Sequence, residues 1–265
     1  MKITFLGTGT SHGVPSLDCM IHDYSFCPSG VCKRSQTDKK HRRTRSSLLI
    51  TSQNKNILID ITPDFRYQAL REKIKRIDSI LLTHAHADHI GGIPDIRSYT
   101  RNRRLFIYGS QESIRSVKET FSYIFKSDTF VGGGIPDIGT CTVREPFELL
   151  DLSIQPVPVV HGPLKGCFGY RIGDVGYIPD VKTIPGNSMD LLKSVKVLIL
   201  NCLRKNRTHS THLTLSESMK IARELSPEKC YFIHMACDID YEFDTELLEP
   251  WMQFSYDGLT IKIDQ

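Results

Sequence analysis

The stretch Leu82-Thr83-His84-Ala85-His86-Ala87-Asp88-His89-Ile90-Gly91-Gly92 places three histidines and an aspartate within six residues. The run Ser79–Leu82 that leads into it is short and apolar, which predicts a buried strand. The histidines therefore follow the end of a strand, and the alternation of side chains along an extended chain directs the first two to the same side. Two neutral imidazoles on one side can bind one metal ion, which leaves Asp88 and His89 to turn toward a second. Four ligand-type side chains at this spacing indicate a metal site.

The composition is that of an ordinary soluble globular protein, with 265 residues, 40% hydrophobic and 24% charged. This length predicts one large α/β domain over residues 1–265. The net charge of +4 favours anionic substrates without indicating a nucleic acid. Residues 1–7 are too short for a signal-peptide core, and the chain has no apolar run on the order of 18 residues. We therefore expect a cytoplasmic chain with no membrane partner, whose cysteines are thiols or metal ligands and not disulfides.

The motif His84-x-His86-x-Asp88-His89 after a strand resembles the signature of the metallo-β-lactamase superfamily. The resemblance implies an αββα sandwich, in which two mixed β-sheets are flanked by helices. It also implies two metal ions, with later ligands from a histidine, an aspartate and a final histidine that each follow a predicted strand. The implied ligand set is His84, His86 and His161 on one metal, Asp88, His89 and His234 on the other, and Asp180 bridging both.

The loop Gly7-Thr-Gly-Thr-Ser-His-Gly-Val-Pro15 follows the first predicted strand, over residues 2–6. It lacks the Gly-Lys-Ser/Thr ending of a phosphate-binding loop, so we interpret it as a tight turn that needs positive φ at glycine. The same motif is similar to the start of PhnP-like cyclic phosphodiesterases, one branch of the superfamily.

Three cysteines, Cys19, Cys27 and Cys32, lie in a loop of fourteen residues. Such a group suits a structural tetrahedral zinc ion if a fourth ligand comes from elsewhere. Three unrelated apolar cysteines are the alternative, and a surface loop does not suit them. The PhnP-like resemblance implies a zinc site here, with its last ligand three residues after the final active-site histidine. This chain has Cys237 at that position, where the family pattern has histidine.

Several local predictions concern polar residues beside the expected strands. The densest basic run, residues 39–45, is interpreted either as a solvated face or as a holder of phosphate. Asp60 interrupts an otherwise apolar strand predicted over Asn56–Ile61, and a buried carboxylate there needs a partner such as a metal-bound histidine. Asp64 is predicted to cap a helix over Phe65–Ile74, with Gln68 on its polar side. Further along, we expect one helix over Ser113–Phe125 and, in the second sheet, strands at Thr142–Val143 and Leu149–Ile154.

A histidine precedes the next predicted helix. Thr214-x-x-Glu217 is a capping box for a helix over Ser216–Leu225, and His212 lies just before it, where an anionic phosphate is favoured. The resemblance to the phosphodiesterase branches implies that His212 protonates the leaving group. His209 is a close rival for this role, and the sequence leaves the choice open.

The resemblance as a whole implies a metal-dependent phosphoric diester hydrolase acting on small phosphate diesters such as cyclic ribose phosphates. Hydroxide held between two divalent ions (Zn, Mn or Fe) attacks phosphorus, Asp88 orients it and His212 acts as the acid. A tRNA 3′-processing endonuclease is an alternative, but only 18 residues separate His161 from Asp180, too few for the long arm of that family. A thiolester hydrolase shares the metal site.

A non-catalytic nucleic-acid or metal-binding module is the remaining alternative, and the complete open ligand set argues against it. The native metal, the substrate, and whether the chain is a monomer or a homodimer stay open.

Overall fold

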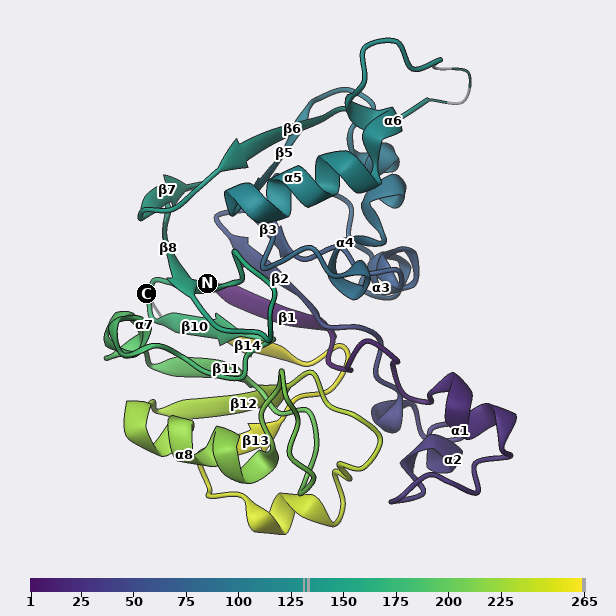
Figure 1. Cartoon of the computed structure of the whole chain (residues 1–265), viewed down its shortest axis with the longest axis vertical. Coiled ribbons are helices and arrows are strands. Elements are labelled where there is room, and N and C mark those ends of the chain that lie inside the picture. Colours follow the sequence, from purple (N-terminus) through teal and green to yellow (C-terminus); the bar gives the residue numbers. More distant parts are fainter. Residues whose placement is uncertain (131, 133, 264–265) are drawn as a thin grey trace.

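The computed structural model describes residues 1–130, 132 and 134–263, and its strands form two mixed sheets (Figure 1). The first sheet has the order β14-β1-β2-β3-β4-β5-β6 and the second the order β13-β12-β11-β10-β9-β8-β7. Strands of the first sheet are β1 (Lys2–Gly7), β2 (Ser47–Ser52), β3 (Lys55–Ile59), β4 (Ser79–Leu81), β5 (Leu105–Gly109), β6 (Ile138–Thr142) and β14 (Thr260–Lys262). Strands of the second are β7 (Phe147–Leu149), β8 (Leu152–Pro158), β9 (Phe168–Ile172), β10 (Val175–Ile178), β11 (Val197–Asn201), β12 (Lys229–Ile233) and β13 (Met252–Phe254). The predicted sandwich of two mixed sheets is confirmed.

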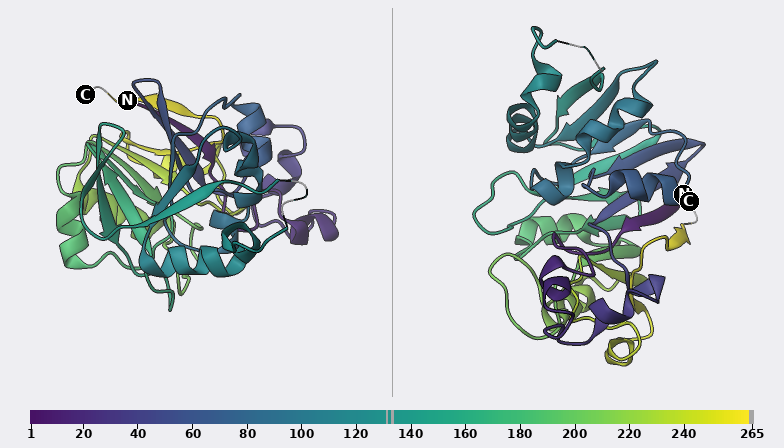
Figure 2. Two further views of the ribbon diagram at one scale, coloured as in Figure 1. Left: turned by 90° about the horizontal axis from the view of Figure 1, so that it is seen from above. Right: turned by 90° about the vertical axis from the view of Figure 1, so that its right-hand side faces the viewer.

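Helices cover the outer face of each sheet, so that the layers follow the order helix, sheet, sheet, helix (Figures 1 and 2). In chain order the helices are α1 (Leu17–Ile21), α2 (Val31–Arg34), η1 (Lys39–His41), α3 (Phe65–Arg71), α4 (Ala87–Ile90), η2 (Ile93–Tyr99), α5 (Gln111–Thr120), α6 (Ser122–Phe125), α7 (Gly186–Leu192), α8 (Leu215–Leu225) and η3 (Asp244–Leu247), where η marks 3₁₀ turns. None of the described helices is long and apolar enough to cross a lipid bilayer.

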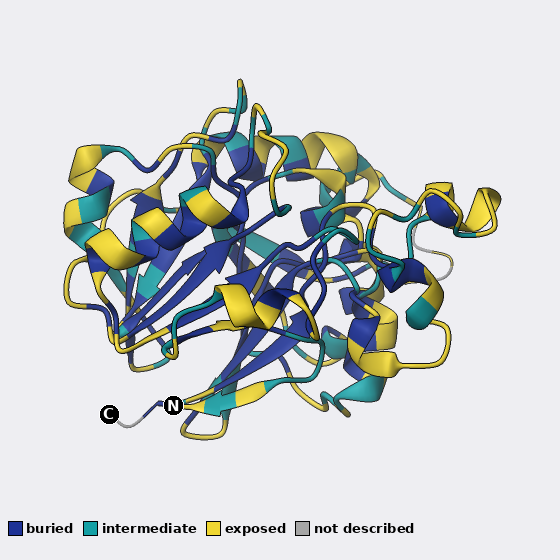
Figure 3. Ribbon diagram, turned by 90° about the horizontal axis from the view of Figure 1, so that it is seen from below, coloured by how far each residue is buried: buried dark blue, intermediate teal, exposed yellow. Residues whose placement is uncertain are grey.

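Three apolar cores hold these layers together, one between the sheets and one under each helical layer (Figure 3). β11 shows how the sequence produces this arrangement. Its residues Val197 and Ile199 pack in the core between the sheets, whereas Leu198 and Leu200 pack under the helices of the second sheet. Because side chains alternate along a strand, a central strand buried on both faces must be apolar at every position, as this one is.

The topology gathers the ends of several parallel strands at one edge of the sandwich. β3, β4 and β5 run parallel in the first sheet, and β10, β11 and β12 run parallel in the second. Asp60 follows β3, and the loop with His84 follows β4. In the second sheet Asp180 follows β10 and His234 follows β12. Residues scattered through the sequence therefore meet at the carboxyl ends of the strands, where α/β proteins place their ligands.

Several local expectations are wrong. The helix expected over Ser113–Phe125 is interrupted at Phe121, which separates α5 from α6. Leu149–Ile154 is not one strand, because Leu150 and Asp151 have φ values of 54° and 65° and form the turn between β7 and β8. Thr142 ends β6 in the first sheet and not in the second.

The residues around α3 also differ from expectation. Asp64 precedes α3 but makes no side-chain cap, because its carboxylate instead accepts hydrogen bonds from the backbone N–H (2.9 Å) and the guanidinium (3.0 Å) of Arg45. Gln68 is fully buried, and its amide donates to Thr44 Oγ1 and to the Arg45 carbonyl, both at 2.9 Å. A helix position that the sequence places on the polar face thus anchors the loop before β2.

The basic run 39–45 is a solvated face only in part, because Lys39, Lys40 and Arg42 are exposed whereas Arg43 is not. The Arg43 side chain is buried and donates hydrogen bonds to the carbonyls of Ala236 and Ile239 and to the Tyr241 hydroxyl. The glycine-rich loop packs against this run. A Cβ on Gly9 would lie 2.8 Å from the Arg43 carbonyl oxygen, so close approach requires glycine there. Gly13 of the same loop has a φ of 66°, which confirms the predicted turn with positive φ at glycine.

Candidate active site

The structure brings all seven predicted metal ligands together in two groups that share Asp180. One ligand atom of each residue lies within 4.8 Å of those of the other members of its group. Members of the first group are His84, His86, His161 and Asp180; members of the second are Asp88, His89, Asp180 and His234. The ligands come from loops of both sheets, so the site depends on the packing of the whole sandwich.

In the first group, three imidazole nitrogens face one another. His84 Nε2 lies 3.0 Å from His86 Nδ1, which lies 3.3 Å from His161 Nε2. Asp180 Oδ2 is 3.7 Å from both His84 Nε2 and His161 Nε2. Three nitrogens and one oxygen converging on a common point are the ligand types and number that zinc accepts.

In the second group, the other oxygen of the same aspartate is used. Asp180 Oδ1 lies 3.0 Å from His234 Nδ1 and 3.5 Å from His89 Nε2. His89 Nε2 is in turn 3.4 Å from Asp88 Oδ2. Asp180 therefore directs one oxygen to each group, which is the arrangement that a bridging carboxylate requires.

Three buried atoms of the second group have no hydrogen-bond partner among the described residues. They are His89 Nε2, Asp180 Oδ1 and His234 Nδ1. Leaving a buried polar atom unsatisfied costs about 1–3 kcal/mol, and charged groups cost more. A divalent cation bound among these atoms would remove that cost, so the residues present fit the metals that the resemblance implies.

The outer nitrogens of the histidines are held by neighbouring groups, which orients the inner nitrogens. His161 Nδ1 donates to the Thr211 carbonyl at 2.9 Å, and His89 Nδ1 lies 2.7 Å from Asp60 Oδ2. The predicted partner of Asp60 is thus confirmed as a histidine of the ligand set. Such outer contacts hold a histidine ring in the orientation that metal binding needs. Asp60 and His234 have φ values of 62° and 65°, a strained conformation for residues other than glycine, and such strain is typical of functional sites.

The electrostatics of the site show that it is built for positive charge. Burial alone would raise the pKa of Asp180, but His234 and His89 hold it well below its usual value. Burial alone would lower the pKa of His89, but the carboxylates of Asp180, Asp88 and Asp60 hold it well above its usual value. Three carboxylates therefore surround the His89 ring, and this excess of negative charge would favour a bound cation.

His212 lies directly beside the ligands, with its ring centroid 4.7 Å from that of His161 and 4.8 Å from that of His234. Asn201, the last residue of β11, determines which nitrogen of His212 carries hydrogen. Its Oδ1 accepts from the Leu213 N–H at 2.9 Å, and its Nδ2 donates to the Pro179 carbonyl at 2.6 Å, so the amide has one orientation. Nδ2 also donates to His212 Nδ1 at 3.1 Å, which leaves the hydrogen on Nε2.

His212 is a neutral ring in this setting, since burial and then His234 lower its pKa to about 2. His209 is only half-buried, and its Nδ1 accepts from the Thr211 N–H at 3.3 Å. Of the two rivals, His212 is the one stacked on a ligand ring. Sequence patterns did not assign a role to Asn201. A polar residue at the end of an apolar strand could have indicated that its side chain is buried and hydrogen-bonded.

A cavity of about 530 Å³ opens beside His212. Cationic or ionisable side chains line it, among them His12, Arg204, Lys205, Arg207 and His209. Its lining also includes Cys237, a member of the cysteine cluster described below, and Pro28 and Ser29, which follow Cys27 of that cluster. The sequence assigned no role to Arg204 or Arg207, because nothing local distinguishes them from other surface arginines.

Residues 55–235 match the family described as the Beta-lactamase superfamily domain. The chain belongs to the beta-lactamase superfamily. A crystal structure described as a new diphosphatase from the PhnP family superposes with a TM-score of 0.87 at 36% sequence identity, covering 99% of this chain and 98% of that chain. At that identity and coverage, the chain is a member of the PhnP family within the superfamily.

Two further relatives carry other names. A protein of Porphyromonas gingivalis named Octanoyltransferase is 35% identical over 269 residues, covering 100% of this chain and 52% of that protein. Ribonuclease Z of Bacillus subtilis is 26% identical over 205 residues, covering 74% of this chain and 55% of that protein. The chain thus spans about half the length of these two relatives.

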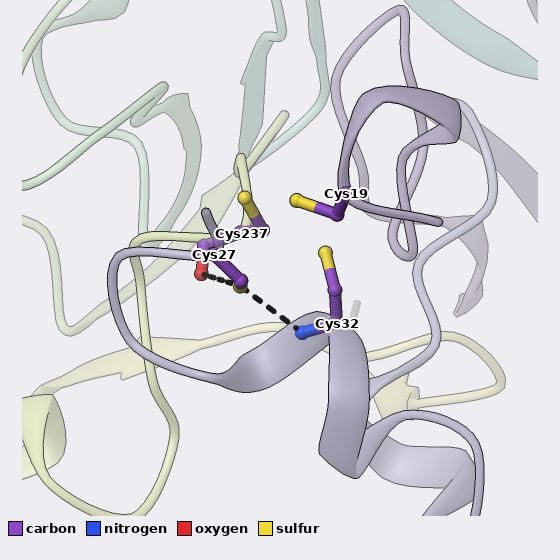
Figure 4. A group of neighbouring side chains, drawn as sticks. All are labelled: Cys19, Cys27, Cys32 and Cys237. Atoms are coloured by element: carbon purple, nitrogen blue, oxygen red, sulfur yellow. Dashed lines mark hydrogen bonds between the residues drawn. The ribbon is translucent and has the colours of Figure 1, made fainter. Parts of the chain in front are cut away.

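The four cysteines that the PhnP resemblance implies as zinc ligands also lie together in this PhnP-family chain (Figure 4). Cys19 is in α1, Cys32 in α2, and Cys27 between them, whereas Cys237 arrives from the loop after β12. Their sulfurs lie within 4.8 Å of one another, and all four are free thiols. A hydrogen bond from Cys237 lowers the pKa of Cys32 to about 5. Four sulfurs in this arrangement fit a closed tetrahedral zinc site.

Proposed function

We propose that this chain is a metal-dependent phosphodiesterase that hydrolyses small phosphate diesters, cyclic ribose phosphates among them. The observation that supports this proposal most strongly is that two ligand groups share Asp180 and lie beside a cationic cavity that His212 lines. The similarity to a PhnP-family diphosphatase supports phosphate chemistry. The two lines of support are independent, since one is geometric and the other comes from relatedness.

Two divalent ions (Zn, Mn or Fe) in these groups would acidify water and offset charge on the phosphoryl oxygens. The side chains of the chain itself supply the rest. Burial alone would raise the pKa of Asp88, but His89 lowers it below its usual value, so Asp88 stays ionised and accepts a hydrogen bond from the attacking water. Arg204 and Arg207 hold the anionic part of the substrate in the cavity.

His212 acts on the departing oxygen. Because Asn201 donates to its Nδ1, the ring offers an Nε2–H hydrogen bond, which stabilises negative charge on that oxygen. His212 thus acts as a neutral hydrogen-bond donor and not, as the sequence led us to expect, as the proton donor. Water supplies the proton that completes the alcohol. Losing one such donor costs about 10²–10³ in kcat.

Phosphorus NMR of the metal-loaded protein with ribose 1,2-cyclic phosphate and 2′,3′-cyclic nucleotides tests the proposal. Wild type should open at least one ring, and His212→Ala should bind both metals but lose about 10²–10³ in turnover. His209→Ala is the matched control and should retain most activity. Failure of the loaded wild type to open any ring would refute the phosphodiesterase assignment, and a metal-depleted His212→Ala protein would refute the role of His212.

A thiolester hydrolase is the second candidate, favoured by the name of the Porphyromonas gingivalis relative. An octanoyl chain would need apolar surface, at about 0.8 kcal/mol for each buried methylene. The cavity beside His212 has few apolar side chains, with Leu203, Pro28 and Ala236 among a majority of polar and charged ones. We therefore rank phosphate above acyl substrates, and hydrolysis of an octanoyl thiolester faster than of every cyclic phosphate would reverse that order.

An RNA 3′-end endonuclease with a long gripping arm is disfavoured. The 18 residues between His161 and Asp180 include β9 and β10, which pair antiparallel within the second sheet. No arm extends from this part of the described chain.

A further inference from the structure

A wide groove of about 1220 Å³ lies between α3 and the segment 95–103, which includes the end of η2. We call it the basic groove and define it by residues 65–76 and 95–103. Its described lining residues include no proposed metal ligand and no residue of the cavity beside His212. The groove is therefore separate from the candidate active site.

The basic groove gathers the positive charge of the chain. Of the fifteen residues that line it, seven are arginine or lysine and one, Asp95, is acidic. Three of the cations come from residues 73–76, three from residues 97–103, and the seventh is Arg66. The six net positive charges of the groove exceed the net +4 of the whole chain, so the rest of the chain carries net negative charge. A polyanion in solution is directed to this face.

Most of these cations are available to a ligand. Among the residues that the structure describes, the exposed side chains of Arg66, Lys73, Lys75 and Arg101 make no ion pair. Arg76 and Arg103 share Asp78, a carboxylate that is only 5% exposed. Asp78 offsets part of the charge of these two arginines, so the four unpaired cations are the ones most available to phosphates.

Part of the lining of the groove is apolar, and we call this part its floor. Leu70 is 64% exposed, and Ile74 and Tyr99 lie half-buried beside it. The Tyr99 hydroxyl donates to the Ile74 carbonyl at 2.9 Å, which ties the two walls together. A second cavity of about 660 Å³ shares Arg97, Arg101, Asn102 and Arg103 with the groove and lengthens it. The result is an extended channel lined by cations and by the apolar floor, with Asp95 and Asp137 as its acidic lining residues.

We propose that the basic groove binds single-stranded nucleic acid. Guanidinium groups bind phosphate oxygens in a bidentate geometry. Unpaired bases stack on exposed aromatic, apolar and guanidinium surfaces. A duplex hides its bases and cannot use the floor at Leu70 and Tyr99, and inorganic polyphosphate has no bases to place there. The charges and the floor together therefore favour a single strand over either polyanion.

Fluorescence anisotropy with a labelled oligouridylate of about 20 nucleotides, long enough for several backbone contacts, tests the proposal on the full metal-loaded chain. The test variant is Arg66→Glu/Lys73→Glu/Arg101→Glu, which changes exposed side chains without ion pairs. The matched control is Lys118→Glu/Lys126→Glu/Lys229→Glu, which alters the net charge equally at exposed sites outside the groove.

Wild type and control should bind with a steep salt dependence, and the test variant should bind at least about tenfold more weakly. Its slope of log K against log salt should be shallower by about 2, since each lost single-strand contact removes about 0.7. Hydrolysis of a cyclic phosphate should be unchanged in the test variant, which separates this proposal from the proposed function. Equal weakening by the control variant, or equally tight binding of a duplex or of polyphosphate of matched charge, would overturn it.

Discussion

Asp60 supports the candidate metal site without being a ligand, and replacing it with asparagine measures that support. Asp60 is fully buried, and its Oδ2 lies 2.7 Å from His89 Nδ1 and accepts from Thr83 Oγ1 at 2.8 Å. Its Oδ1 accepts from the Thr83 N–H at 2.8 Å. Three donors thus face the two carboxylate oxygens.

Asp60→Asn keeps the size of the side chain but replaces one acceptor with an NH2 group. In either orientation of the amide, that NH2 group faces a donor, so His89 or Thr83 loses its partner. Asparagine tolerates the positive φ of 62° at this position, so the substitution adds no backbone strain. Outer contacts of this kind are worth roughly 10- to 100-fold in metal affinity, which corresponds to about 1.4–2.7 kcal/mol.

The assay is competition for zinc or manganese between the protein and a chromophoric chelator, with folding checked by denaturant unfolding. Asp78→Asn is the matched control, since it removes another nearly buried carboxylate, just before β4, whose ion pairs are with Arg76 and Arg103. The control should lose stability and keep its metal affinity. Wild-type affinity in a folded Asp60→Asn protein, or an equal loss in the control, would refute the reasoning.

Three further outcomes are expected. Asn201→Ala should cost about 1–3 kcal/mol of stability and lower turnover with both metals retained, as measured by unfolding and metal analysis, because Leu213 loses its acceptor and His212 its orientation. Cys32→Ser should reduce bound zinc by one ion per chain in metal analysis while His-ligated metals remain. Burial alone would raise the pKa of Asp78, but hydrogen bonds from the Asn56 N–H and two arginines hold it below its usual value. Its stabilising contribution is therefore present above about pH 4 and lost as the pH falls through the folded-state pKa, so the stability difference between wild type and Asp78→Asn should shrink below pH 4.

Local patterns predicted much of the metal site. His84, His86, Asp88 and His89 stand within six residues, so their meeting depends only on a strand end and a turn. The capping box at Thr214 and Glu217 is likewise local, and both of its hydrogen bonds form. The alternation of apolar residues predicted most strands, because burial on one or both faces constrains every second position.

Patterns failed where a contact joins distant segments. Gln68 has the helix position of a polar surface residue, yet it is buried because the loop at Thr44 and Arg45 covers it. Arg43 belongs to a run that predicted a charged surface, yet carbonyls of residues 236 and 239, nearly two hundred positions away, surround it. Neither burial can be inferred from neighbours in the sequence.

The sequence by itself determined the superfamily, the sandwich and the candidate ligands, because ligand spacing and strand periodicity are properties of short segments. Tertiary structure alone decided that Asp180 directs one oxygen to each ligand group, that Asn201 orients His212, and that cations from two separate segments line one basic groove. These features depend on the directions of side chains from elements far apart in the chain. Such directions are set by the packing of two sheets and their helices, which no single segment encodes.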